Sequence, residues 1–312
     1  MTGWSASGTT TAVKAALGAS LAAALVTAGA MAIPGDRGEP GPGVAAPDVA
    51  APDDAAPDVA SPGVPAPDVA RTAAGRTAAA APLQQFEEIP YDGRFTFLRV
   101  YFEAGGGGLR GGFRGRGGRG EPPWAHDYPR AETNFAKILS ETTMMTPYME
   151  GSRVLPMDDP EIFKYPVIYM VEVGYWRPSD EEIAALGAYL EKGGFLIVDD
   201  FRDRQLYPFI DVIQRALPGI QPLEMPTDHE IFDAFFRIED PYALIPPYGR
   251  SRPVYLGLFE NNDPNGRLMA ILNYNNDIAE YWEFSDRGYY PIDLNNDAFK
   301  FGVNYIVYAM TH

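Results

Sequence analysis

The sequence predicts an α/β domain with a mostly parallel central sheet, preceded by a long segment whose composition is not that of a folded domain. Three observations support this prediction: a strand-helix-strand pattern over residues 165–201, a further helix after it, and a Pro- and Ala-rich composition before residue 86. A buried strand, a helix and a second buried strand in close succession are typical of a parallel crossover unit. The folded domain is therefore expected to span residues 86–312.

The central unit of this domain is residues 165–201. Its first apolar, β-branched run, residues 167–173, is too short for a free-standing helix and favours a strand that is buried on both faces. Ser179 and Glu182 have the spacing of a capping box at a helix start, and a pair of glycines at 193–194 favours the helix end. A second buried strand is then expected to end in Asp199 and Asp200.

The other elements are predicted from period-2 and helical spacing of apolar residues. They are, in chain order, a first strand at 94–102, a short helix at 131–139, an edge strand at 153–155, a helix at 206–217, a short apolar segment at 223–225, two strands at 254–259 and 267–274 joined by a turn, and a final helix at 297–310. The final helix is apolar nearly all round, so it is expected to be buried in the core.

Two segments before the domain have other roles. Residues 1–32 contain an apolar stretch at 15–32 that ends in Ala30, Met31 and Ala32, the small-x-small pattern that signal peptidase accepts. We expect a cleaved export signal, with an uncleaved membrane anchor as the alternative. Residues 33–85 repeat Ala-Pro-Asp-Val-Ala, contain no aromatic residue and are poor in large apolar side chains, which predicts a disordered spacer. The chain is therefore expected to be periplasmic or on the cell surface.

Composition excludes several kinds of chemistry. The chain has no cysteine, so disulfides, thiolate metal sites and cysteine nucleophiles are absent. Its 312 residues include 42 acidic and 25 basic side chains; residues 1–85 hold 7 and 4 of these, which leaves 35 and 21, a net charge of −14, on the rest. Such a charge argues against nucleic acid as a partner, despite a Gly- and Arg-rich loop at 105–120 that we interpret as a solvated insertion.

Candidate ligand-binding residues follow from the fold prediction. Ligands bind beyond the carboxyl ends of the strands in open α/β sheets, where Asp199 and Asp200 are expected. Adjacent strand residues point to opposite faces, so this pair has an equally simple interpretation as a capping or hydrogen-bonded structural pair. The full set of candidates, with a rigid aromatic loop and a second loop as walls of the cleft, is Trp124, Asp127, Tyr128, Asp199, Asp200 and His229.

No cofactor is required by any motif in the chain. The alternative is a divalent transition metal, since either aspartate of the 199–200 pair with His229, and with Asp127 or His126, would give the carboxylate and imidazole mixture that suits zinc, manganese or iron. No HExxH, EF-hand, phosphate-loop or GxSxG pattern occurs, and Ser179 is better explained as a helix cap than as a nucleophile.

Several short motifs occur in the order of a known bacterial family. They are Trp124-Ala125-His126-Asp127-Tyr128-Pro129 with Asn134, Tyr165-Pro166, Gly193-Gly194-Phe195 leading to Asp199-Asp200, Asp228-His229 before Ile231-Phe232, and Gly302-Val303-Asn304 with Tyr308-Ala309. Over about residues 93–311 the sequence resembles the domain-of-unknown-function 4159 family, whose domains are similar in fold to class I glutamine amidotransferases. The resemblance implies a flavodoxin-like three-layer sandwich in an exported or membrane-anchored protein, and it implies no established activity.

The missing cysteine removes the amidotransferase reaction, which needs that nucleophile after a central strand. The sequence therefore favours an exported, non-catalytic binding or scaffold module for a cell-envelope protein or a small ligand. The alternative is a metal-assisted hydrolase that acts on a carbohydrate or an ester.

Overall fold

The computed structural model describes residues 89–104, 122–247 and 252–312. The predicted signal or anchor at 1–32, the linker at 33–85 and the Gly/Arg loop at 105–120 lie outside the described residues. The chain divides into two units, residues 1–73 and 74–312, and all of the described residues belong to the second. None of the helices in the described part is long and apolar enough to cross a membrane.

The described unit is an α/β domain built on a seven-stranded, mostly parallel sheet. The strands in chain order are β1 (Leu98–Tyr101), β2 (Arg153–Pro156), β3 (Val167–Val171), β4 (Phe195–Phe201), β5 (Leu223–Glu224), β6 (Val254–Phe259) and β7 (Leu268–Tyr274). Their order across the sheet is β2-β1-β3-β4-β7-β6-β5. The strands from β2 to β7 in this order pair in parallel, and β6 pairs antiparallel with both β7 and β5.

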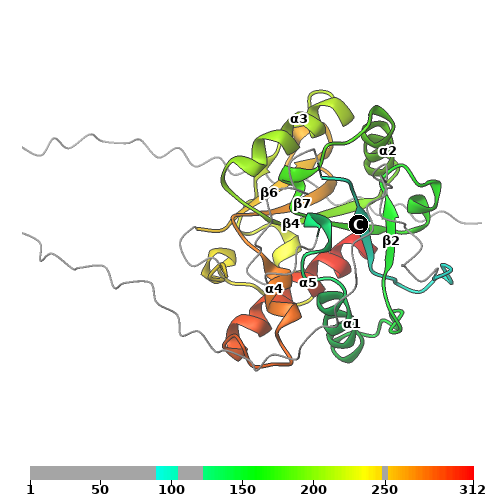
Figure 1. The fold of residues 1–312 in the computed structure, drawn as a ribbon. Coiled ribbons are helices and arrows are strands. Elements are labelled where there is room, and N and C mark those ends of the chain that lie inside the picture. Colours follow the sequence, from blue (N-terminus) through cyan, green and yellow to red (C-terminus); the bar gives the residue numbers. More distant parts are fainter. Residues whose placement is uncertain (1–88, 105–121, 248–251) are drawn as a thin grey trace, which may run out of the picture. The chain divides into compact units, whose positions relative to one another are not determined.

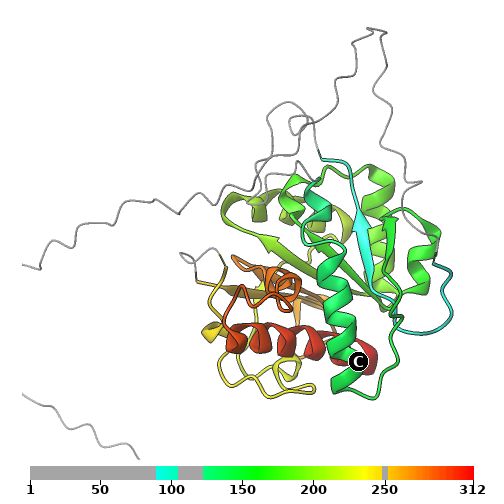
Figure 2. The same cartoon turned by 60° about the horizontal axis from the view of Figure 1, so that its bottom comes forward.

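Within the described residues, five α-helices cover the two faces of the sheet (Figures 1 and 2). They are α1 (Arg130–Thr142), α2 (Asp180–Glu191), α3 (Leu206–Ala216), α4 (Ile278–Glu283) and α5 (Ile292–Thr311). Helices α2 and α3 pack on one face, and α1, α4 and α5 pack on the other (Figure 1). Alternation along β3 divides its side chains between the two cores, with Val167, Tyr169 and Val171 facing α5 and the intervening residues facing α2.

The predicted central unit is confirmed. β3 and β4 pair in parallel from Val167 opposite Phe195, and α2 connects them. Ser179 Oγ accepts from the amide of Glu182 at 3.1 Å, and Glu182 accepts from the amide of Ser179 at 2.8 Å, which is the predicted capping box. β3 is shorter than predicted, because Glu172 adopts a left-handed conformation (φ 53°) that ends the strand.

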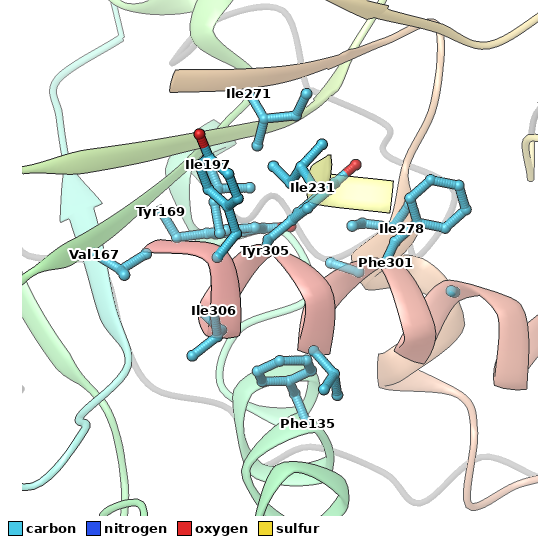
Figure 3. Packing of buried hydrophobic residues seen from close by; sticks show 14 of the residues in the cluster. Phe135, Val167, Tyr169, Ile197, Ile231, Ile271, Ile278, Phe301, Tyr305 and Ile306 are labelled. Carbon is cyan, nitrogen blue, oxygen red and sulfur yellow. The ribbon is translucent and has the colours of Figure 1, made fainter. Parts of the chain in front are cut away.

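The last helix is buried, as its sequence predicts, and it begins earlier than expected, at Ile292. Figure 3 shows Phe301, Tyr305 and Ile306 of α5 between the sheet and Phe135 of α1. Tyr305 is fully buried, and its hydroxyl donates to Oδ1 of Asn273 on β7 at 2.8 Å. This packing fixes the face of the sheet on which Asn273 and its neighbour Asp199 lie.

Candidate functional site

Carboxylates gather where the parallel strands end. Glu172 follows β3, Asp199 and Asp200 lie near the end of β4, and Asp277 precedes α4 just after β7. Because β3, β4 and β7 are neighbours and run in parallel, their carboxyl ends meet at one edge of the sheet. We call this edge the carboxyl edge.

A single histidine reaches this edge from the loop before α1. His126 Nδ1 lies 2.6 Å from Oδ2 of Asp200, and its side chain is 35% exposed, so the imidazole is partly open to solvent. Burial disfavours a charge on the ring, but the hydrogen bond to Asp200 and the charges of Asp127 and Asp200 outweigh it and raise the pKa of His126 to about 10. The imidazolium is therefore a counter-ion of the carboxylates at this edge.

Asp127, the next residue, is buried without a conventional partner. Its side chain is fully buried, and no amide, hydroxyl or cationic donor of the described residues hydrogen-bonds to either carboxylate oxygen. The nearest cation is His126, whose Nδ1 lies 3.6 Å from Oδ2 of Asp127. Burial, together with the charges of Asp200 and Glu280, raises the pKa of Asp127 well above its ordinary value, against the attraction of His126. An unsatisfied buried carboxylate is costly, so its presence here requires an explanation.

Further carboxylates surround the His126–Asp200 pair. Burial, and next the charge of Asp200, raise the pKa of Glu172 to about 8, although Gln205 donates to its Oε2 at 2.8 Å. Burial and the charges of Asp200 and Asp127 likewise raise the pKa of Asp277 well above its ordinary value. Repulsion of this kind is relieved by protons or by a bound cation.

Asp199 has a structural role at the same edge. Its Oδ2 accepts from the hydroxyl of Tyr169 at 2.7 Å and from the amides of Ile278 and Ala279 at 2.9 and 3.0 Å, and its Oδ1 accepts from Nδ2 of Asn273 at 3.1 Å. The side chain thus holds the first turn of α4 against β4. Burial raises its pKa to about 6, while these hydrogen bonds oppose the rise. Asp199 therefore positions the α4 residues of the site.

Backbone strain is concentrated at this edge. Seven described residues other than glycine have positive φ, and five of them lie here: Asp127 (64°), Glu172 (53°), Asp200 (46°), Asp203 (51°) and Asn275 (59°). Their backbones are linked, since Glu172 N donates to the carbonyl of Asp200 and Asn275 N donates to that of Phe201. Left-handed conformations cost about 1 to 2 kcal/mol per residue outside glycine, somewhat less for Asp and Asn. Strain of this kind clusters at functional sites.

Arg99, at the centre of β1, holds the loop that carries His126. This buried guanidinium bonds Oε1 of Glu132 at 2.5 Å through Nε, and its Nη1 donates to the carbonyls of Trp124 and His126 at 3.2 and 2.8 Å. Nη2 of Arg99 and Oε2 of Glu132 are buried without partners, so the ion pair is incompletely compensated. Burial of these unpaired atoms costs stability, and we infer that it is tolerated because Arg99 holds His126 and Asp127 at the carboxyl edge.

The structure brings together some of the predicted site residues and separates others. Asp127 and Asp200 lie together at the carboxyl edge with His126. Trp124 is buried, with its ring 5.3 Å from that of Tyr101 and 5.9 Å from that of Tyr128, so it is a core residue beneath the loop. Tyr128 is half-buried beside it.

His229 does not join the carboxyl edge, in contrast to the expectation. Its Nδ1 accepts from the amide of Ile231 at 3.1 Å, and its ring packs against Phe259 and Tyr308 at 5.6 and 5.8 Å. Phe259 ends β6, which runs antiparallel, and it pairs with Leu268 at the start of β7. His229 therefore lies at the amino edge of the parallel strands and serves as a cap for the short helix at 230–232.

Sequence reasoning missed Glu172, Asp277 and Glu280. The apolar run at 167–173 places Glu172 inside a continuous strand, and the other two residues follow a strand whose neighbours in space are far away in sequence. One local signal was present: Asn275, Asn276 and Asp277 directly follow the strand at 267–274, and Asn and Asp favour the left-handed and capping conformations found at strand ends.

Two groups of side chains at this edge have the spacing of metal ligands. Ligand atoms of His126, Asp127 and Glu280 lie within 4.8 Å of one another, and so do those of His126, Asp200 and Asp277. A mixture of one imidazole and several carboxylates suits Mn²⁺, Fe²⁺ or Zn²⁺. The carboxylate of Asp127 fits such an ion, because its oxygens receive no amide, hydroxyl or cationic donor from the described residues and its other close neighbour is a second carboxyl group, that of Glu283.

A comparison with known protein families shows the family to which the chain belongs. The domain-of-unknown-function family DUF4159 matches residues 116–310, which is more than half of the chain. This chain belongs to that family. The DUF4159 region contains His126, Asp127, Glu172, Asp200 and Glu280, and so includes the whole carboxyl edge. No curated protein matches the chain.

Proposed function

We propose that this DUF4159 domain is a metal-dependent binding module of the cell envelope, with a divalent transition metal held at the carboxyl edge. The observation that carries the proposal is Asp127, a buried carboxylate whose two oxygens lack an ordinary donor and which lies beside His126 and Glu280. His126, Asp127 and Glu280 would hold the ion. Asp200 would orient the imidazole by its hydrogen bond, as carboxylates do for metal-binding histidines.

The metal can be tested directly. Protein purified without an affinity tag and titrated with Mn²⁺ and Zn²⁺ by calorimetry is expected to bind about one equivalent, and His126→Gln and Asp127→Asn to lose that binding. Two matched variants serve as controls: His229→Gln, at the amino edge, and Asp211→Asn, on the exposed face of α3. Both should bind as the unchanged chain does. Binding of less than about a tenth of an equivalent by the unchanged chain would refute the proposal.

A metal-assisted hydrolase is the second candidate, and Glu172 favours it. This residue is mostly buried, adopts a strained conformation at a strand end, and has a pKa raised by burial to about 8, a value suited to proton transfer near neutral pH. Turnover of ester or glycoside substrates by the metal-loaded chain, lost in Glu172→Gln while metal binding persists, would support catalysis. If no substrate is turned over and both proteins bind metal equally, the domain is a binding module.

The fold and the location complete the proposal. A central parallel sheet between two layers of helices supports the flavodoxin-like, amidotransferase-like sandwich, and Glu172 and Asp200 have left-handed backbones at strand ends like the sharp turn of a nucleophile elbow. Both positions carry carboxylates in a chain without cysteine.

Export of the protein is supported by the apolar stretch that ends in Ala30, Met31 and Ala32. If the signal is cleaved there, the intact mass of the secreted protein should correspond to a chain that begins at Ile33. A mass that includes residues 1–32 would identify an anchor instead.

A further inference from the structure

An exposed aromatic group lies on the segment between α4 and α5. The ring of Tyr289 is 5.0 Å from that of Tyr290 and 5.2 Å from that of Phe284, and the pairs meet at 83° and 39°. Tyr289 is 67% exposed, whereas the other two rings are half-buried and support it. An aromatic side chain held in place by its neighbours, with one ring open to solvent, is preorganised to stack on a ligand.

This aromatic group touches the carboxyl edge. The hydroxyl of Tyr290 donates to Oε1 of Glu280 at 2.7 Å. Glu280 is one of the three residues, with His126 and Asp127, whose possible metal-ligand atoms lie close together. Tyr290 also packs against the buried ring of Tyr281 at 4.7 Å, which fixes its position. A ligand bound at the carboxyl edge and extending past Glu280 would therefore meet Tyr290 first and Tyr289 next.

We propose that Tyr289 and Tyr290 form a subsite for the sugar ring of a neutral carbohydrate bound at the carboxyl edge. The subsite rests on the proposed metal-dependent function and names its ligand class. A sugar ring offers apolar C–H groups to an aromatic face, and its hydroxyls donate to carboxylates such as Glu280. The charge selects against anionic ligands, because the many carboxylates of the edge repel phosphorylated or carboxylated molecules.

A lipid or other purely apolar ligand fits these residues less well. The exposed ring is a tyrosine, and the acidic residues Glu283 and Asp286, which flank Phe284 in the sequence, are half-buried and exposed, respectively. Asp286 is bound to Arg130 at 2.5 Å, so the rim of the subsite is polar. A polyhydroxylated ligand uses both the ring and this rim, whereas an acyl chain would bury charged groups without partners.

The test uses the full chain on an array of neutral, anionic and cationic oligosaccharides, with and without Mn²⁺. We expect Mn²⁺-dependent binding to neutral glycans, and a loss of about tenfold or more in affinity for Tyr289→Ala. Tyr289→Phe keeps the ring and should bind as the unchanged chain does. The control is Tyr207→Ala on α3, because Tyr207 is 66% exposed, almost as much as Tyr289, but lies on the other face of the sheet. It should bind normally.

The outcomes separate the subsite from the metal site. Equal glycan binding by Tyr289→Ala and the unchanged chain overturns the subsite, and so does binding confined to anionic glycans or no binding to any glycan. Calorimetry of Tyr289→Ala with Mn²⁺ should give the metal affinity of the unchanged chain; a parallel loss of metal affinity would show that the ring acts on the metal site rather than on a sugar. Glycan binding that needs Tyr289 but no metal would keep the subsite and refute the metal-dependent function.

Discussion

Two adjacent aspartates show how strongly a single position decides the role of a side chain. Asp199 points toward α4 and receives four hydrogen bonds, whereas Asp200 points toward His126. Their spacing on a strand predicts opposite directions but not which residue is structural. That assignment depends on α4, whose first residue, Ile278, lies 79 positions after Asp199 in the chain.

The structural role of Asp199 gives a prediction for stability. Asp199→Ala would leave the hydroxyl of Tyr169, the amide of Asn273 and two backbone N–H groups buried without an acceptor. We expect a loss of about 3 kcal/mol or more in the free energy of unfolding, measured by urea denaturation. Asp200→Ala should cost clearly less, because its partner His126 is partly exposed and can be solvated. Equal losses for the two variants would contradict the division of roles.

Replacement of Asp127 should have the opposite effect on stability from replacement of Asp199, and it should also remove metal binding. Asp127→Asn removes a carboxyl group that is buried among other acids, so the metal-free domain is expected to become more stable by about 1 kcal/mol. The same change should abolish metal binding. Urea denaturation in the presence of a chelator measures the first effect, and calorimetry the second. If Asp127→Asn destabilises the metal-free domain by a similar amount, the carboxylate has a structural partner and is not held for a ligand.

At the scale of elements, patterns that are local in sequence predicted the structure well. The capping box at Ser179 fixed the start of α2, and the helical spacing at 206–217 matches α3 within one residue. The turn between two strands at 254–274 was also predicted, and β6 and β7 form that antiparallel pair. Each of these signals depends on contacts within one segment, which is the information that sequence patterns carry.

Elements whose form depends on distant neighbours were predicted less well. The first strand was expected at 94–102 and is regular only over Leu98–Tyr101, although the carbonyls of Phe95 and Phe97 still accept from the amides of Tyr148 and of Arg153, the first residue of β2. α4 was not predicted as a helix, because its six residues are held by Asp277 and by Asp199 from another strand. The candidate site was incomplete for the same reason, since Asp277 caps this helix and Glu280 lies in its first turn.

The packing of α5 gives a prediction at this scale. A Cβ at Gly302 would lie 2.4 Å from the ring of Phe135 on α1 and 2.5 Å from that of Trp282 on α4. Gly302→Ala should therefore destabilise the domain by about 1 to 3 kcal/mol, despite the higher helix propensity of alanine. Lys300→Ala, in the same helix but half-exposed, is the control and should change the free energy of unfolding by much less. A neutral or stabilising Gly302→Ala would mean that the three helices can separate without cost.

For the molecule as a whole, composition predicted the sign of the charge but not its placement. The acidic excess is spread over the chain, yet the fold draws at least six carboxylates to one edge with a single imidazole: Asp127, Glu172, Asp200, Asp277, Glu280 and Glu283. No spacing in the sequence brings these residues together. They meet because the order β3-β4-β7 places the ends of three strands side by side. The overall topology therefore determines the electrostatics of the site.

This arrangement predicts how stability depends on pH. The pKa of Glu172 is raised from 4.5 to about 8 and that of His126 from 6.5 to about 10, so the folded state holds protons that the unfolded chain has released. Stability from Glu172 is complete below about pH 4.5 and is lost as pH rises to about 8, and that from His126 is complete below about pH 6.5 and is lost toward about pH 10. The metal-free domain should therefore become less stable between about pH 6 and about pH 9.

A bound metal should oppose this trend, which makes pH the sharpest whole-molecule test of the proposed site. Metal ions bind neutral imidazole and ionised carboxylates, so their affinity rises with pH and the stability that they add rises too, to about 2.7 kcal/mol when the free metal is 100 times its Kd. Urea midpoints with chelator should fall from about pH 6 to about pH 9, and saturating Mn²⁺ should flatten or reverse that fall. His126→Gln should lessen the fall with chelator and show no response to Mn²⁺, because it removes both the raised pKa and a ligand. Parallel curves with and without Mn²⁺ in the unchanged chain would show that protons alone balance the charge of the carboxyl edge.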